Sequence, residues 1–441
     1  MVKVVFLLII TSVQFLSLSG QKNNSVQSGS KKQYLSDIDP SYALLEKIQM
    51  EAYNDGSAVR HVSPPDPVTL SIRSEMIALL PFFDDDAILS AEAKKSREAY
   101  NEFWRKSNEQ SARELATMIL PTRYENANWY AVVSRLNKRL LAVISKQYPD
   151  FKQRIIFGTI PTSSVNAATL KVPGSTDILV LFNEDLFNAS YVLTKVLIQT
   201  FSWQEHSLSY KRDHVRQQAK DPKINQEFRK IMLWYLNTSS RPTEFYPLEP
   251  GQMKMTIVLT RSMEIFALAH EYSHAILGHL IRDEKKYANN WVQEIQADNL
   301  GFLLMFSTLM DSGDQEERAF GRWGALLMLN AMDIFERATI TAETGEIPPG
   351  PEQDALENQM IEGVLTCLNS PNSDICKKFL ESKTPSTHPP TWLRMDFLRN
   401  LMKTEPSLAP IMNDEWDFGY ALIIAGHALL LDNSSFFKPI R

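Results

Sequence analysis

Three histidines and one glutamate lie close together in the segment AHEYSHAILGH, residues 269–279. His270 and His274 are four residues apart, so on a helix both imidazoles leave from the same face. Glu271 follows His270 directly and projects beside that face. In the H-E-x-x-H arrangement the two histidines bind a metal ion, and the glutamate takes a proton from water at that ion. The segment therefore predicts a hydrolytic metal centre with Glu271 as the general base.

A catalytic zinc site needs a third protein ligand and an open coordination position. His279 is not expected to supply the ligand, because five residues after His274 a continuing helix has turned by about 140°. The metzincin pattern needs glycine at position 277 and histidine at position 280, and this chain has leucine at both. The third ligand is therefore expected from another element.

Two acids follow in the segment NNWVQEIQADNLGFLL. Glu294 and Asp298 are four residues apart and share one face of a helix that is expected to start near Asn290. One carboxylate can bind the metal, while the other accepts the N–H of a ligating histidine and fixes its tautomer. The alternative is a pair of solvated acids on a helix surface. With a glutamate as third ligand, the site would be that of a gluzincin.

The segment HEYSHAILGH followed by EIQAD resembles the metallopeptidase family of the CAAX prenyl endopeptidases and the HtpX heat-shock proteases. That family has H-E-x-x-H and then E-x-x-A-D on the next helix. The resemblance implies one zinc ion per chain, bound by His270, His274 and Glu294, with Asp298 behind a ligating histidine. The chain lacks the multiple transmembrane helices of the membrane members, so their prenylated substrates are not expected. Lit-type bacterial proteases share similar short motifs and are an alternative relative.

A later segment, STHPPTWLRMDFL (386–398), resembles the family's Ser/Thr-His-Pro segment, which has an arginine six residues after the histidine. The resemblance places His388 near the zinc ion as a catalytic donor to the oxyanion. Arg394 would sit behind it or contact the substrate carbonyl. Under the alternative, the two prolines simply start the next helix, His388 is exposed, and Arg394 pairs with a surface acid.

The elements that must position these residues are mostly helices. The apolar run DILVLF (177–182) is a predicted strand, either an edge strand that binds substrate backbone beside the metal-binding helix or a buried core strand. With the resemblance, we expect a predominantly helical α+β fold, with a zincin-like metallopeptidase core, a small sheet and an active-site helix. The helical patterns lie at about 88–118, 126–147, 204–236, 262–281, 290–309, 315–338, 352–368, 390–403 and 416–431.

The first twenty residues have the order of a secretory signal peptide, with Lys3, an apolar run and then small residues. The alternative is an uncleaved anchor, although the run is short for a bilayer span. We expect four regions: a signal peptide (1–20), a flexible N-terminal or pro-segment (21–60), a helical region (61–160) and the catalytic region (161–441). The mature protein is expected to be secreted or periplasmic, without an integral membrane span.

The chain has two cysteines, Cys367 and Cys376, which lie in a loop-like segment. In an oxidising compartment they are expected to form a local disulfide, and the alternative is two free buried thiols. The formal net charge of −6 is small for 441 residues, and the basic residues are scattered, so no nucleic-acid partner is expected.

Together these patterns predict a zinc-dependent endopeptidase that acts on protein or peptide substrates. An exopeptidase of the gluzincin aminopeptidase type is not expected, because the G-A-M-E-N signature is absent. An alternative from another class is a secreted zinc-binding or chaperone-like module without proteolytic activity. A purely structural zinc ion would have four protein ligands and no use for Glu271, so that glutamate favours the enzyme.

Overall fold

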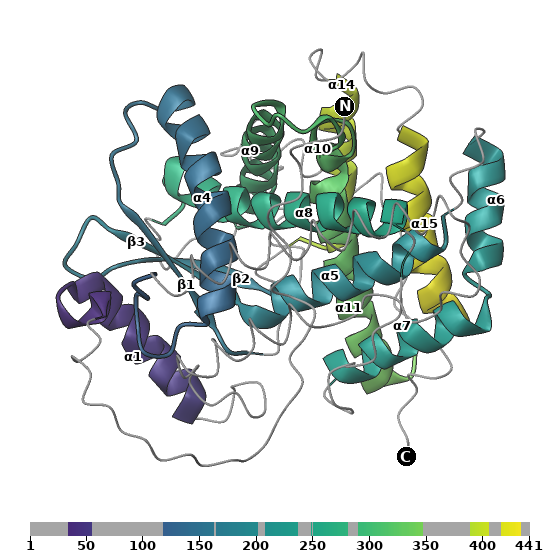
Figure 1. The fold of residues 1–441 in the computed structure, drawn as a ribbon, viewed down its shortest axis with the longest axis horizontal. Coiled ribbons are helices and arrows are strands. Elements are labelled where there is room, and N and C mark those ends of the chain that lie inside the picture. Colours follow the sequence, from purple (N-terminus) through teal and green to yellow (C-terminus); the bar gives the residue numbers. More distant parts are fainter. Residues whose placement is uncertain are drawn as a thin grey trace, which may run out of the picture.

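The structure is a computed structural model that describes residues 34–54, 118–162, 165–201, 208–236, 248, 250–280, 290–346, 389–404 and 416–433. Helices dominate these residues, and one three-stranded sheet lies among them (Figure 1). The prediction of a predominantly helical α+β fold is confirmed. The predicted signal peptide, Cys367, Cys376 and His388 lie outside the described residues.

The helices coincide in large part with the predicted patterns. Those predicted at about 88–118 and 352–368 lie outside the described residues. The pattern at 204–236 is two helices, because the Asp221 side chain accepts the backbone N–H groups of Lys223 and Ile224 and caps a new helix. In chain order the helices are η1 (Leu35–Asp37), α1 (Pro40–Asn54), α4 (Ala127–Gln147), α5 (Glu184–Gln199), α6 (Leu208–Gln218), α7 (Pro222–Tyr235), α8 (Pro250–Ile276), α9 (Asn290–Met310), α10 (Gln315–Phe320), η3 (Gly321–Trp323), α11 (Gly324–Thr344), α14 (Thr391–Thr404) and α15 (Trp416–Asp432).

The sheet has the order β1-β3-β2, formed by β1 (Ile155–Ile160), β2 (Ala167–Lys171) and β3 (Ile178–Asn183). Strand β3 pairs in parallel with β1 and antiparallel with β2. The predicted strand at 177–182 is therefore the central strand, and the edge-strand interpretation of it is wrong. Its side chains alternate between two apolar clusters, so both faces are buried, and a continuous apolar run is typical of such a strand.

Helix α1 covers one face of the sheet (Figure 1). Leu45 is fully buried against it, the Ser41 hydroxyl donates to Asp177 at 2.7 Å, and the Gln49 amide donates to the Thr159 carbonyl at 2.6 Å. Residues 34–54 thus belong to the folded body. This differs from the flexible N-terminal segment expected over 21–60.

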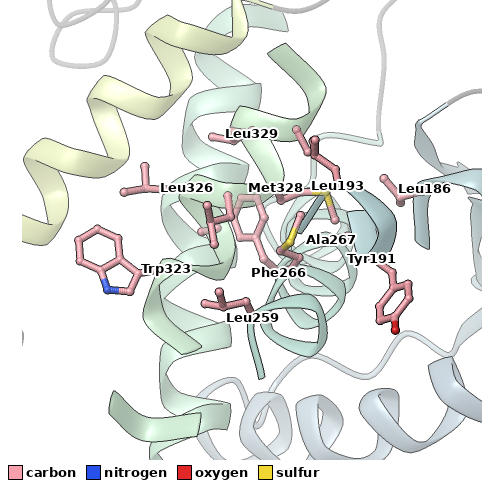
Figure 2. Close-up of a cluster of buried hydrophobic side chains, with 14 of the residues drawn as sticks. Leu186, Tyr191, Leu193, Leu259, Phe266, Ala267, Trp323, Leu326, Met328 and Leu329 are labelled. Carbon is pink, nitrogen blue, oxygen red and sulfur yellow. The ribbon is translucent and has the colours of Figure 1, made fainter. Parts of the chain in front are cut away.

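Helix α8 runs through the middle of the helical body (Figure 1), in contact with α4, α5, α9 and α11. Figure 2 shows side chains from α5, α8 and α11 gathered in one buried cluster, including Leu186, Leu259, Phe266, Met328 and Leu329. Because α8 is packed on nearly every side, its histidines are held on a rigid support. None of the described helices is long and apolar enough to cross a membrane.

Candidate metal centre

Helices α8 and α9 bring together three side chains that could hold a metal ion, His270, His274 and Glu294, all of them buried. The Nε2 atoms of the two histidines lie 3.2 Å apart. Nε2 of His270 lies 3.5 Å from Oε2 of Glu294, and Nε2 of His274 lies 3.5 Å from Oε1 of the same carboxylate. Neighbouring ligand atoms of a tetrahedral zinc site with bonds of 2.0–2.1 Å are separated by about 3.3 Å. The donor set and its spacing therefore fit such an ion.

The first ligand, His270, is held from behind by a charged pair. Its Nδ1 lies 2.9 Å from Oδ1 of Asp298, which leaves Nε2 directed at the metal group. Asp298 in turn accepts two hydrogen bonds of 2.7 Å from Nε and Nη2 of Arg394. Nη2 of Arg394 also lies 3.8 Å from Glu294.

The placement of Arg394 decides between its predicted roles. Only 4% of its side chain is exposed, and the guanidinium is engaged with Asp298. The surface-acid alternative is therefore wrong for Arg394. Its position behind His270 favours a positioning role over contact with a substrate carbonyl. His388 lies outside the described residues, so its role stays a prediction.

The second candidate ligand, His274, has another histidine behind it. Its Nδ1 lies 3.0 Å from Nδ1 of His279, and Nε2 of His279 lies 3.2 Å from Oε1 of Gln296. If Nε2 of His274 binds metal, Nδ1 carries its proton and donates it to His279. His279 is then protonated at Nε2 and donates to Gln296. With this assignment, each N–H in the two contacts faces an acceptor: His274 donates to His279, and His279 donates to Gln296.

His279 reaches this place because α8 ends earlier than predicted. The helix stops at Ile276, and Gly278 has a φ of +73°, a left-handed conformation that favours glycine. The N–H of His279 bonds the carbonyl of His274 at 2.9 Å, and the N–H of Gly278 bonds that of Ala275 at 3.2 Å, which is the Schellman pattern. His279 is not part of the candidate metal-binding group, as expected. The continuing helix assumed for it is wrong, because the turn brings its ring against that of His274.

Glu271 is buried and faces the same cavity as the metal group. The hydroxyl of Thr169, on strand β2, donates to Oε2 of its carboxylate. Burial raises the pKa of Glu271, against the lowering effect of His270 and of the Thr169 hydrogen bond. A carboxylate with a raised pKa is suited to taking and returning a proton.

Burial alone would lower the pKa of His270, but Asp298 and Glu294 raise it to about 10, so the two buried carboxylates favour a positive charge beside them. Burial disfavours charge on Glu294, but the hydrogen bond from His270 and the charge of Arg394 outweigh it and hold the pKa of Glu294 well below its usual range. Arg394 and His270 likewise lower the pKa of Asp298 against burial. Burial and the neighbouring His270 lower the pKa of His274 to about 3, so its imidazole is neutral, as a metal ligand must be.

The metal-binding group opens into a cavity of about 330 Å³. Residues 166–170, which include most of β2, line one side, and side chains of α5, α8 and α11 line another. Strand β2 is at the edge of the sheet, where it pairs with β3 alone, and it also contacts α8. The strand beside the metal-binding helix is therefore β2.

Helix α9 comes very close to α8 at the first ligand. A Cβ atom at Gly301 would lie 2.9 Å from both N and Cα of His270. Only a residue without a side chain permits this approach, which sets the separation between the histidines and Glu294.

Sequence reasoning missed four contributors to the site: Thr169, His279, Gln296 and Gly301. The glycine before His279 is a helix-stop signal and could have revealed the turn. Thr169 lies in a five-residue strand, AATLK, that lacks the long apolar run of β3, and nothing near Gly301 or Gln296 marks them in the sequence. No protein-family model, no curated protein and no solved structure matches this chain.

Proposed function

We propose that this protein is a zinc-dependent endopeptidase. The observation that supports this best is the combination of His270, His274 and Glu294, spaced for a tetrahedral ion, with Glu271 in the same cavity. Two imidazoles and one carboxylate are a ligand set typical of catalytic zinc. Among the described residues the group has three such ligands, which leaves a position open for water or substrate.

A zinc ion held there would polarise the scissile carbonyl and make a neighbouring water acidic. Glu271 takes a proton from that water and later gives it to the nitrogen of the leaving amine. Thr169 binds one carboxylate oxygen of Glu271 and so fixes the orientation of the base. Asp298 and Arg394 keep Nε2 of His270 directed at the ion.

Strand β2 supplies the surface for the substrate backbone. It is an edge strand of the sheet and its residues line the cavity, and an extended peptide can pair with the edge of such a strand. A peptide bound there would pass Glu271, because Thr169 of the strand contacts that carboxylate. Binding through backbone groups along a strand suits cleavage within a chain, which favours an endopeptidase.

Membership of the CAAX prenyl endopeptidase and HtpX-like family is part of this proposal. It is supported by H-E-x-x-H followed by E-x-x-A-D, and by the position of Asp298 and Arg394 behind His270. We place the protein in a secreted or periplasmic setting on the basis of the first twenty residues. The alternative remains a zinc-binding module without proteolytic activity.

Two variants test the proposal against that alternative. The wild-type protein should hold about one zinc per chain and hydrolyse unfolded protein, with activity lost to a chelator and restored by zinc. Glu271→Gln should keep the metal while hydrolysis falls by roughly 10²–10⁴-fold or more. Glu294→Ala should lose the metal, and exposed Glu343→Ala serves as its control. Unchanged hydrolysis in metal-loaded Glu271→Gln would reject the mechanism. Bound zinc without any hydrolysis by the wild type would favour the non-catalytic module.

A further inference from the structure

The cavity at the metal centre has two chemically different halves. Every titratable side chain among the described lining residues belongs to the metal centre or contacts it. The wall formed by helices α5, α8 and α11 is apolar. It consists of Leu186, Phe266, Ala267, Met328, Leu329 and Met332.

These apolar side chains come from three helices and converge. Figure 2 shows Leu186, Phe266, Ala267, Met328 and Leu329 in one cluster. Ala267 lies one turn before Glu271 on the same helix, so this wall starts directly beside the general base. A side chain next to the scissile bond is therefore within reach of it.

Two methionines make this wall adaptable. Met328 and Met332 are four residues apart and share one face of α11. Met332 is only partly buried and lines the cavity. Methionine is flexible and polarisable, which lets a pocket accept apolar groups of different shape.

We infer that the apolar wall binds a large uncharged side chain of the substrate, of the leucine, methionine or phenylalanine class, next to the scissile bond. The inference rests on the proposed endopeptidase function and names its substrate class. Such a side chain exchanges water for apolar contacts along the wall. A charged side chain would lose its hydration there without gaining an opposite charge, because the charged groups of the cavity are committed to the metal centre.

The test begins with zinc-loaded wild-type protein and a library of synthetic decapeptides of diverse sequence, with the cleaved bonds mapped by mass spectrometry. Leucine, methionine and phenylalanine should be enriched at one position beside the cleaved bond. In a peptide cleaved well, replacing that residue by glutamate should lower kcat/KM by roughly 100-fold or more. No enrichment, or enrichment of charged residues, would overturn the inference and leave the protease intact. No cleavage of any peptide would instead reject the proposed function.

Variants at Met332 test whether this wall is responsible. Met332→Lys places a positive charge on the wall. The ratio of kcat/KM for the leucine peptide to kcat/KM for the glutamate peptide should therefore fall by roughly ten-fold or more. Met332→Ala keeps the wall uncharged and should lower kcat/KM for leucine-containing peptides by roughly ten-fold. Met50→Lys, on α1 and outside the cavity lining, is the matched control and should leave the preference unchanged. Wild-type selectivity in folded, zinc-loaded Met332→Lys and Met332→Ala would overturn the assignment of this wall.

Discussion

The Nδ1 atoms of His274 and His279 lie 3.0 Å apart across the turn that ends α8. The other histidine of the candidate metal centre, His270, has the carboxylate of Asp298 in the corresponding place, at 2.9 Å. One imidazole thus has another imidazole behind it, and the other has a carboxylate. A carboxylate partner makes an imidazole more basic, whereas an imidazole partner that accepts its N–H mainly selects the tautomer.

His279→Ala should weaken zinc binding by about 10–100-fold, because His274 then loses the group that fixes its tautomer. The affinity can be measured by competition with a chromophoric chelator. His279→Gln keeps an acceptor and should restore part of the loss. His214→Ala, on α6 and outside the cavity lining, is a control that should bind zinc normally. An unchanged affinity in His279→Ala would show that the contact plays no part in metal binding.

Arg394→Ala should destabilise the protein by about 3–5 kcal/mol, because it leaves the buried carboxylate of Asp298 with His270 but without the charge and two hydrogen bonds of the arginine. Urea unfolding of the zinc-free protein measures this loss without interference from the metal. Arg394→Lys keeps the charge but cannot form both hydrogen bonds, so its stability should lie between those of Arg394→Ala and the wild type. A stable Arg394→Ala variant that binds zinc normally and has reduced kcat would instead favour direct contact with the substrate.

Gly301→Ala should weaken zinc binding and lower stability by about 1–3 kcal/mol, since the added methyl group pushes α9 away from His270. Gly313→Ala is the matched control, because a Cβ atom there meets nothing within 4 Å. Thermal unfolding and chelator competition on both variants provide the comparison. If Gly301→Ala and Gly313→Ala have the same stability and the same zinc affinity, α9 can shift away from His270 without affecting the candidate ligands.

Stability should fall in acid partly because of Glu317, which is buried with Arg139 and Arg261. Burial alone would raise its pKa, but the two arginines lower it to about 2. The stabilisation from this lowered pKa is therefore complete above the unfolded value of about 4.3 and is lost as pH falls toward 2. Its size is roughly 3 kcal/mol.

Urea unfolding of the zinc-free protein between pH 2 and 6 tests this assignment. Glu317→Gln should show a flatter dependence on pH in that interval, since glutamine does not titrate. Glu343→Gln, at an exposed position, should follow the wild type. A Glu317→Gln variant with the wild-type slope would assign the acid sensitivity to other carboxylates.

The local periodicity of the sequence was enough to predict most of the described helices and the metal ligands on them. A helix repeats every 3.6 residues, so a spacing of four residues places two side chains on the same face. This holds for His270 and His274 on α8, and for Glu294 and Asp298 on α9. The buried strand at 177–182 was also predicted, since an apolar run between turn residues needs no information from distant parts of the chain. These features depend on neighbours in the sequence alone.

The tertiary structure decided how these elements meet. That β3 is central and β2 is the strand beside the metal centre depends on pairing between segments, which local propensity does not encode. The contact from Thr169 to Glu271 joins residues far apart in the sequence, and the closeness at Gly301 exists only because two helices pack there. His279 shows how the two levels combine: Gly278 ends the helix locally, and the resulting turn brings the His279 ring within 3.0 Å of the His274 ring.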